Sequence, residues 1–262
     1  MFMKNIILLI FNSLTFVLTL YLNYLFGAGV GDRKSVGEIS SQFDTLITPA
    51  GYAFSIWGLI YLMLFGFLVY QWITYFRNNS HKSLAPSSFW FGLSNLLNAL
   101  WIVVWTSELI GLSSLVIFGL LASLLVLVFR LKLEIWDAPL SIIAFVWWPI
   151  CIYTGWIVVA SVVNLSVWFY TLNIFQNEPL WTIIVLMVAT GIYLFLTFKR
   201  NMREAAVVGV WAFVAISVKQ WDVNQEVAYT ALLLVGLLTI AVSYHAFVNR
   251  STNPITKIFQ RS

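Results

Sequence analysis

The chain has 262 residues, of which 61% are hydrophobic and only 9% are charged, with a mean hydropathy of +0.91. A soluble globular protein is about 45–50% apolar and about 25% charged, so this composition excludes a soluble domain and indicates an integral membrane protein. The net charge of +4 does not indicate a nucleic-acid partner, because the basic residues lie between apolar runs, where they set topology.

Eight stretches of the chain are apolar over about the 20 residues that a helix needs to cross a bilayer. None shows the alternating pattern of a β-strand, and lipid admits only helices or closed barrels as spanning structures. We therefore expect an all-α, polytopic membrane helix bundle with about eight transmembrane helices. The expected spans are Asn5–Phe26, Gly51–Phe76, Ser88–Ser107, Gly111–Phe129, Pro139–Phe169, Leu180–Phe198, Ala205–Val218 and Val227–Val248.

The basic residues support this count because they alternate between the loops. Eleven of the 14 Lys and Arg residues fall on one side of an eight-span topology and three on the other. By the positive-inside rule the first side is cytoplasmic, which places both termini in the cytoplasm. No organelle-targeting presequence is visible, which favours a bacterial inner membrane. The eleven are Lys4, Arg77, Lys82, Arg130, Lys132, Lys199, Arg200, Arg203, Arg250, Lys257 and Arg261, and the three are Arg33, Lys34 and Lys219.

The first span and the connector after it each have two interpretations. Lys4, an apolar run and the small residues at 27–29 resemble a secretory signal peptide, but the run is long and carries Asn12 and Asn23, so we favour a retained helix. Residues 27–50 form the longest connector. A long loop on a compact bundle is often a lid or a binding element, and a solvated connector is the alternative.

Three of the expected helices carry a stripe of aromatic, small and amide side chains at spacings that share one helix face. An unpaired amide is costly in hydrocarbon, so Asn98 and Asn164 should face protein, water or a ligand rather than lipid. Interhelical hydrogen bonds, worth about 1 kcal/mol each, are the alternative role for both. The stripes are Phe54, Trp57 and Tyr61; Ser94, Asn98, Trp101 and Trp105; and Tyr153, Trp156, Ala160, Asn164 and Trp168.

The tryptophans differ in their expected depth. Trp and Tyr at span ends usually anchor a helix among the lipid headgroups, and Tyr52 and Trp57 fit that role as well as a binding role. Trp101 and Trp156 lie near mid-span, where a headgroup belt cannot use them, so they are better candidates for a pocket. Stacked indoles and phenols suit a flat, conjugated ligand that an amide can orient.

No pattern in the chain marks an enzyme. A nucleophile–base pair and a set of metal ligands are both missing from the sequence, and we expect neither a catalytic nor a metal site. His81 and His245 are expected as solvated residues near cytoplasmic span ends. The single cysteine, Cys151, excludes an intrachain disulfide and is expected as a small buried hydrophobe.

Other functional classes stay open. The near absence of mid-span charge disfavours an ion-coupled transporter but permits passage of an apolar molecule. Lys219 could hold retinal as a Schiff base only if it lay deeper; near Asp222 at a span end it should instead reach the interface. A structural or regulatory role without a pocket is the third class, and small residues at Ser88-x3-Gly92 and Gly119-x3-Ser123 allow close helix packing within the chain or in a homodimer.

Motifs in three of the expected helices, taken together, resemble the TspO/MBR family of tryptophan-rich sensory proteins and mitochondrial translocator proteins. They occur in the family's order and cover roughly residues 1–170. The matching segments are Pro49-Ala-Gly-Tyr52-Ala-Phe54 with Trp57-x3-Tyr61 for the loop and second helix, Leu97-Asn98-x2-Trp101 for the third helix, and Tyr153-x2-Trp156-x7-Asn164-x3-Trp168 for the fifth.

This resemblance implies a five-helix ligand-binding bundle over residues 1–170, followed by three additional transmembrane helices and a short cytoplasmic tail over residues 171–262. It also implies a planar hydrophobic ligand of the tetrapyrrole kind, such as protoporphyrin, no required cofactor, and a homodimer as the family often shows. The stripes and the resemblance together give the candidate ligand-binding residues Tyr52, Phe54, Trp57, Tyr61, Asn98, Trp101, Tyr153, Trp156, Ala160 and Asn164.

The chain departs from the family pattern at several positions. Ala50 stands where a second Pro is expected, and Tyr52 stands where a Trp is expected. Pro149, which should bend the fifth span because it removes a backbone hydrogen bond, lies seven residues before Trp156 rather than beside the Tyr. No Arg or Lys follows soon after Tyr170, so the weak cholesterol-type pattern is missing and a sterol ligand is not expected.

Overall fold

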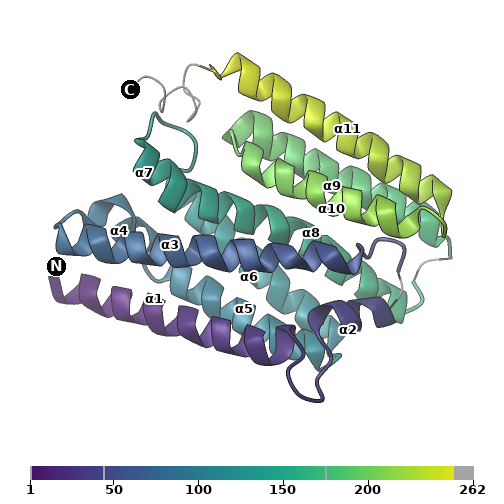
Figure 1. Ribbon diagram of the computed structural model, residues 1–262, viewed down its shortest axis with the longest axis horizontal. Helices are drawn as coiled ribbons and strands as arrows, with labels where there is room; N and C mark the ends of the chain where they lie inside the picture. The colour runs from purple at the N-terminus through teal and green to yellow at the C-terminus, as the bar shows by residue number, and fades with distance from the viewer. Residues whose placement is uncertain (1, 44, 175, 251–262) are drawn as a thin grey trace.

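The computed structural model describes residues 2–43, 45–174 and 176–250, and in these ranges the chain is helical and contains no strand. Eight helices of 17 or more residues run side by side (Figure 1). This confirms the predicted all-α helix bundle; the predicted tail beyond residue 250 lies outside the described residues. The eight are α1 (Phe2–Leu22), α3 (Ile56–Phe76), α5 (Trp90–Thr106), α6 (Ile110–Arg130), α8 (Trp148–Thr171), α9 (Glu178–Arg200), α10 (Arg203–Gln220) and α11 (Gln225–Val248).

Six of these helices, counted with the short turns that extend them, are long and apolar enough to cross a membrane: α1, α3, α6, α8, α9 and α11. Of the other two, α5 has only 17 residues, and α10 has 18 that include Arg203, Glu204 and Lys219. Both pack among the six, α5 between α1 and α6, and α10 against α8, α9 and α11. Helices enclosed in this way expose less of their surface to lipid and tolerate a shorter apolar run.

The helices α9, α10 and α11 lie together on one side of α8, and α1 and α5 lie on the other (Figure 1). The contact between α8 and α10 is close, because a Cβ placed on Gly155 would lie 2.7 Å from Ala205 Cα. The ring of Tyr193 on α9 covers Gly209 on α10, and its hydroxyl donates to the Gly155 carbonyl at 2.7 Å. Small residues therefore let the three C-terminal helices dock on α8, as is common between membrane helices.

Buried polar bonds attach α1 to the bundle. Asn12 Nδ2 donates to Gln71 Oε1 of α3 at 3.1 Å, and Thr19 Oγ1 donates to the Asn95 carbonyl of α5 at 2.8 Å. Leu9 and Phe16 on the same face are fully enclosed. These contacts make α1 part of the packed bundle.

Seven short elements connect or extend the long helices. Pro149 lies in the first turn of α8, which follows the π-helical turn η4. Proline has no N–H to donate to the preceding turn, and a widened π-helical turn tolerates the loss of that hydrogen bond. The glycines of the two small-residue pairs face neighbouring helices of the same chain, Gly92 against Phe11 and Gly119 against Leu97, whereas Ser88 lies before the beginning of α5. The short elements are η1 (Asn23–Gly27), α2 (Val36–Gln42), η2 (Gly51–Ser55), η3 (Ser80–Lys82), α4 (Leu84–Ser87), α7 (Leu140–Ile142) and η4 (Ile143–Trp147).

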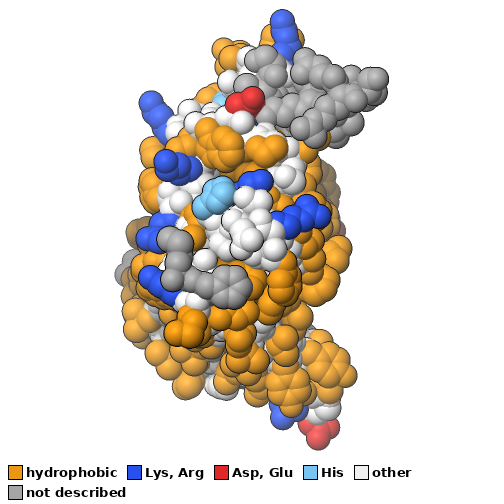
Figure 2. Space-filling view, turned by 90° about the vertical axis from the view of Figure 1, so that its left-hand side faces the viewer, with side chains coloured by type: hydrophobic (Ala, Val, Ile, Leu, Met, Phe, Trp, Pro, Cys, Tyr) orange, Lys and Arg blue, Asp and Glu red, His pale blue; other side chains and the backbone are white. Residues whose placement is uncertain are grey.

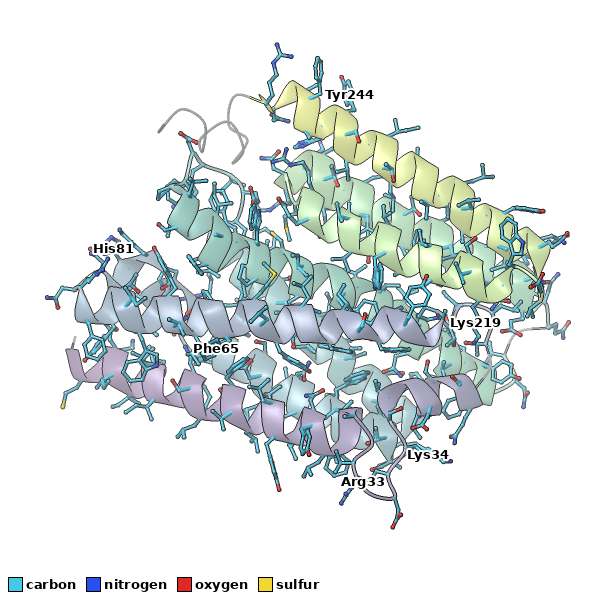
Figure 3. All side chains as sticks on the ribbon, viewed as in Figure 1. Arg33, Lys34, Phe65, His81, Lys219 and Tyr244 are labelled. Atoms are coloured by element: carbon cyan, nitrogen blue, oxygen red, sulfur yellow. The ribbon has the colours of Figure 1, made fainter. Side chains whose placement is uncertain are left out.

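The two ends of the bundle differ in charge. Figure 2 shows Lys, Arg and His side chains gathered over the end that carries the N-terminus and α7, above a belt of apolar side chains. Arg33, Lys34 and Lys219 lie at the opposite end from His81 (Figure 3). His81 is exposed as predicted, whereas the prediction for His245 was wrong. His245 is only 6% exposed, because the turn between α9 and α10 packs against it, and its Nε2 lies 3.1 Å from Asn201 Oδ1 in that turn.

Candidate functional site

The connector that follows η1 folds over one end of the bundle, and we call its described residues between 28 and 55 the lid segment. It contains α2, whose N-terminus is fixed by a capping box: the Ser35 hydroxyl accepts from the Glu38 amide, and the Glu38 carboxylate accepts from the Ser35 amide at 2.7 Å. Hydrogen bonding to this carboxylate, first by the Ser35 amide and then by the Ser35 hydroxyl, favours its charged form and lowers the pKa of Glu38 below its usual value. A seven-residue helix is marginal by itself, so the capping box and tertiary contacts together hold α2 in place.

The capping box predicts a measurable titration. Because the folded pKa of Glu38 is lowered, its capping contribution is present above the unfolded pKa of about 4.3 and is lost as the pH falls through the lower folded value. Ser35→Ala should raise the pKa of Glu38 part of the way back, since the backbone bond remains. Carboxyl-carbon NMR titration measures this. Ser41→Ala, whose hydroxyl bonds only to Gly37, should leave the value unchanged, and an equal shift in both variants would contradict the assignment.

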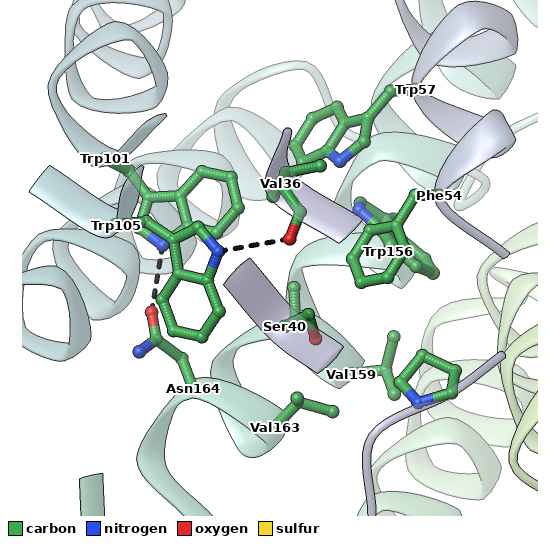
Figure 4. A pocket seen from close by; sticks show the side chains of 12 residues that line it. Val36, Ser40, Phe54, Trp57, Trp101, Trp105, Trp156, Val159, Val163 and Asn164 are labelled. Carbon is green, nitrogen blue, oxygen red and sulfur yellow. Dashed lines mark hydrogen bonds between the residues drawn. The ribbon is translucent and has the colours of Figure 1, made fainter. Parts of the chain in front are cut away.

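Beneath the lid segment lies a small cavity with almost entirely apolar walls (Figure 4). Its roof comes from α2 and the following loop, and its walls come from η2, α3, α5 and α8. The contribution of α8 repeats at intervals of three and four residues, so it is one face of that helix. The lining residues are Val36, Ser40, Pro49, Phe54, Trp57, Trp101, Trp105, Trp156, Val159, Ala160, Val163 and Asn164.

Four tryptophan rings form most of the wall. Trp101 and Trp105 stack with an interplanar angle of 19° and centroids 6.1 Å apart. The ring of Trp57 lies 6.0 Å from Trp101 and meets Trp156 edge-on at 6.2 Å, and Phe54 meets Trp156 in the same way at 6.0 Å. Offset and edge-on pairs are the favoured aromatic arrangements, so the rings hold one another in fixed orientations.

Asn164 is held by the helices around the cavity. Its Oδ1 accepts from the Trp101 indole at 2.9 Å, and its Nδ2 donates to Ser113 Oγ at 2.9 Å and to Ser114 Oγ at 3.2 Å on α6. One side chain thus connects α5, α6 and α8. This is the interhelical role that the sequence left open, and it also fixes the orientation of the Trp101 ring.

Two polar groups of the lining are fully buried and have no hydrogen-bond partner among the described residues. They are the indole nitrogen Nε1 of Trp156 and the hydroxyl of Ser40. A buried polar group without a partner costs about 1–3 kcal/mol. A molecule in the cavity could accept a hydrogen bond from the Trp156 N–H, and it could donate a hydrogen bond to the Ser40 hydroxyl or accept one from it.

The family model described as TSPO-like protein matches residues 9–244. The chain belongs to the family of TSPO-like proteins. No curated protein and no solved structure matches it. The family match continues past residue 170 and through most of α11, so it includes the three C-terminal helices of this TSPO-like protein, and the apolar helical bundle makes it an integral membrane protein.

Six of the ten predicted ligand-binding residues of this TSPO-like protein line the cavity: Phe54, Trp57, Trp101, Trp156, Ala160 and Asn164. Tyr52 does not. Its side chain is 43% exposed and packs edge-on against Trp211 of α10, with the ring centroids 5.3 Å apart. Tyr52 therefore lies on the outer side of the lid segment.

The other three predicted residues, Tyr61, Asn98 and Tyr153, form a polar layer next to Trp57. Asn98 Oδ1 accepts from Asn23 Nδ2 at 2.8 Å and from the Tyr61 hydroxyl at 3.2 Å, and Asn98 Nδ2 donates to the Tyr153 hydroxyl at 3.0 Å. The rings of Tyr61 and Tyr153 lie 5.4 and 6.1 Å from that of Trp57. This layer supports the wall of the cavity from behind.

Sequence reasoning missed half of the lining. Trp105 belonged to the predicted stripe on α5 but was not chosen, although its spacing was a sufficient signal. Val159 and Val163 lie on the same face of α8 as Trp156 and were passed over because valine carries no functional signal. Val36 and Ser40 come from the lid segment, and only the unusual length of that connector indicated them.

The cavity is small. Its volume is about 30 Å³, whereas sites for organic ligands usually measure about 300–1,000 Å³. A groove of about 460 Å³ lies next to it, between η1, the beginning of α2 and the beginning of α3, and shares Val36, Phe54 and Trp57 with the cavity. Moving these three side chains or the lid segment would join the two spaces into one of ligand size.

A cluster of polar and titratable side chains, separate from the cavity, lies where α8 meets the C-terminal helices. Oxygen and sulfur atoms of Glu134, Cys151 and Glu204 come within 4.8 Å of one another. The Trp148 indole donates to Glu204 at 3.1 Å, and Arg203 lies beside this carboxylate. The sequence did not indicate this group, because its members come from three separate elements.

Proposed function

We propose that this TSPO-like membrane protein binds a planar hydrophobic ligand of the tetrapyrrole kind in the tryptophan-walled cavity, and that it senses or moves this ligand. The observation that carries the proposal is the lining itself, in which four indoles and Phe54 surround an apolar space with two unpaired polar groups, Trp156 Nε1 and Ser40 Oγ. Sites for small molecules combine mostly apolar walls with few polar groups in just this way.

The wall geometry favours a flat molecule. The stacked pair of Trp101 and Trp105 offers a broad face, while Trp156 and Phe54 meet at nearly a right angle, with an interplanar angle of 85°. A conjugated ring could lie against the pair while an acceptor at its edge receives the Trp156 N–H. The propionate oxygens at the edge of a porphyrin have this chemistry.

A titration with protoporphyrin IX in nanodiscs, followed by tryptophan fluorescence, tests the proposal. Wild-type protein should show saturable quenching. Trp156→Phe keeps an aromatic ring but removes the N–H, and we expect the affinity to fall about tenfold, since one hydrogen bond contributes about 0.5–1.5 kcal/mol and 1.4 kcal/mol is a factor of ten.

The control is Trp136→Phe, which changes a tryptophan that meets Trp147 edge-on and does not line the cavity. It should bind like the wild type. Linear quenching, or equal affinities for Trp156→Phe and the control when circular dichroism shows both to be folded, would sink the proposal. The rings would then serve packing, and a structural or regulatory role would be favoured.

Transport is the second candidate function, and the groove beside the cavity favours it. Because the two spaces share three side chains, a ligand could pass between cavity and groove without crossing a charged barrier. Proteoliposomes loaded with protoporphyrin distinguish the two functions. Faster release than from protein-free liposomes indicates movement of the ligand, whereas tight binding with unchanged release indicates sensing or storage.

We also propose that the basic end of the bundle faces the cytoplasm of a bacterial cell, with both termini on that side. The positive-inside rule and the gathering of Lys and Arg at this end (Figure 2) support this orientation. The lid segment would then face the opposite side of the membrane. Labelling of a cysteine placed at Asn79, compared with one placed at Ser107, tests the orientation in intact cells.

A further inference from the structure

The lid segment is attached to the bundle on two sides. On one side it meets α5, where the Trp105 indole donates to the Val36 carbonyl at 3.5 Å and the Trp105 ring lies 6.1 Å from Phe43. On the other side it meets α9 and α10. The second attachment comes from helices that contribute nothing to the lining of the cavity.

Three hydrogen bonds make the second attachment, and all involve the backbone of residues 46–53. Glu178 Oε1, at the beginning of α9, accepts from the Leu46 amide at 2.7 Å. The Ala215 carbonyl of α10 accepts from the Ala50 amide at 3.1 Å, and the Trp211 indole donates to the Ala53 carbonyl at 3.1 Å. Each bond joins the lid segment to a different point on the C-terminal helices.

These contacts are suited to holding the lid segment down. The Glu178 bond is charge-assisted, and such bonds are shorter and stronger than neutral ones. The edge-on contact between Tyr52 and Trp211 lies beside the Ala53 bond. The stretch held in this way includes Pro49 and ends next to Phe54, and both residues line the cavity.

Entry of a ligand requires something to move, because the cavity is far smaller than a porphyrin. The walls are poor candidates, since Asn164 connects α5, α6 and α8 through three hydrogen bonds. The lid segment contains only short helices, and its residues 46–53 are held from outside the cavity by α9 and α10. It is therefore the element that can open without taking the helix bundle apart.

We propose that α9 and α10 act as a clamp that keeps the lid segment closed, and that a ligand enters and leaves only when residues 46–53 are released from Glu178, Trp211 and Ala215. This inference rests on the proposed ligand site, and it gives the C-terminal helices a regulatory role at that site. In this proposal the clamp bonds form again over the bound ligand, which occupies the space opened when the side chains of Val36, Phe54 and Trp57 move and join the cavity to the groove. Weakening the clamp should then speed association and dissociation alike and change the affinity little.

The test uses the double variant Glu178→Gln/Trp211→Phe in nanodiscs. The first change keeps an acceptor oxygen but removes its charge, and the second keeps a ring beside Tyr52 but removes the N–H. The matched control is Trp221→Phe, directly after the end of the same helix α10, where the ring packs edge-on against Tyr229 of α11. Two quantities are measured: hydrogen–deuterium exchange of residues 46–55 without ligand, and the rate constants for protoporphyrin IX.

We expect exchange of residues 46–55 to rise at least fivefold in the double variant and both rate constants to rise about as much, with a change of less than twofold in their ratio. Lid exchange equal to that of the control would overturn the clamp. Faster exchange with unchanged rate constants would also overturn it, because the ligand would then use another route. If the double variant is unfolded by circular dichroism, Trp211→Phe alone decides by the same criteria.

The exchange measurement separates this proposal from the previous one. If wild-type protein fails to bind protoporphyrin, the proposed ligand is wrong, but the exchange of the lid segment still shows whether α9 and α10 hold it.

Discussion

Replacing Asn98 by leucine should lower the free energy of unfolding by about 2–4 kcal/mol, although leucine has a similar volume. The side chain is completely buried and joins three partners, Asn23, Tyr61 and Tyr153, from three helical elements. Leucine can neither accept hydrogen bonds from Asn23 and Tyr61 nor donate one to Tyr153, so each of the three residues loses a hydrogen-bond partner. The loss should therefore exceed that of a single interhelical bond.

Two magnitudes bracket this value. Interhelical hydrogen bonds in membrane proteins average about 0.6 kcal/mol each, which gives about 2 kcal/mol for three bonds. A buried donor left without an acceptor costs about 1–3 kcal/mol, which raises the total if the tyrosine hydroxyls find no new partner. Unfolding by sodium dodecyl sulfate in mixed micelles, followed by circular dichroism, measures the change.

Asn5→Leu serves as the control for Asn98→Leu. Asn5 lies on α1, is half-buried, and makes no side-chain hydrogen bond among the described residues. Its replacement should change the stability by less than about 0.5 kcal/mol. Equal effects of the two substitutions would show that the polar layer around Asn98 contributes nothing specific.

The same variant tests whether Asn98 supports the wall of the cavity or contacts the ligand. Asn98 was predicted to line the pocket, but it lies behind Trp57 and outside the cavity. Folded Asn98→Leu protein should therefore lose less affinity for protoporphyrin than Trp156→Phe. A larger loss would place the amide in contact with the ligand after all.

The sequence was sufficient to predict which faces of the helices point inward. Lipid forces every backbone polar group into a helix, and the cost of a lone amide forces Asn98 and Asn164 toward protein. Both are buried. The spacing of Trp156, Ala160 and Asn164 then placed one face of α8 correctly, because helix geometry leaves no freedom within a continuous span.

Partners across the fold could not be predicted in the same way. Asn98 and Asn164 look alike in the sequence, yet only Asn164 reaches the cavity, because Tyr61 and Tyr153 happen to meet Asn98. His245 is buried for a similar reason: Asn201 comes to it from another helix. Tyr52 was expected in the pocket by resemblance, but Trp211 of α10, far beyond the matching motif, draws it to the outer side.

The lid segment shows a third limit. Residues 27–50 were predicted only as a long connector, yet Ser35-x2-Glu38 forms a capping box that begins the helix α2. Seven residues are too few for a periodic apolar pattern, however, and α2 depends on contacts with α5, η1 and η2. Its position over the cavity is thus a property of the assembled bundle.

Replacing Gly155 by alanine should lower the free energy of unfolding by about 1–3 kcal/mol, the usual cost of forcing extra atoms into a packed contact. The new Cβ would lie 2.7 Å from Ala205 Cα and 2.8 Å from the Ala205 carbonyl oxygen. Both are backbone atoms of α10, so no side chain can rotate away, and the two helices must separate. The bond from Tyr193 to the Gly155 carbonyl should lengthen with them. Unfolding in mixed micelles measures the loss.

Gly191→Ala on α9 is the matched control, because a Cβ there meets nothing within 4 Å. In a helix, alanine is favoured over glycine by about 0.8–1.0 kcal/mol, so this variant should be as stable as the wild type or more so. The two Gly→Ala changes thus have opposite expected signs. Two destabilisations of equal size would show that the contact at Ala205 is not tight. Because α10 also carries Trp211 and Ala215, separation at Gly155 should speed amide exchange in the lid segment, which would connect the packing of α8 and α10 to access to the cavity.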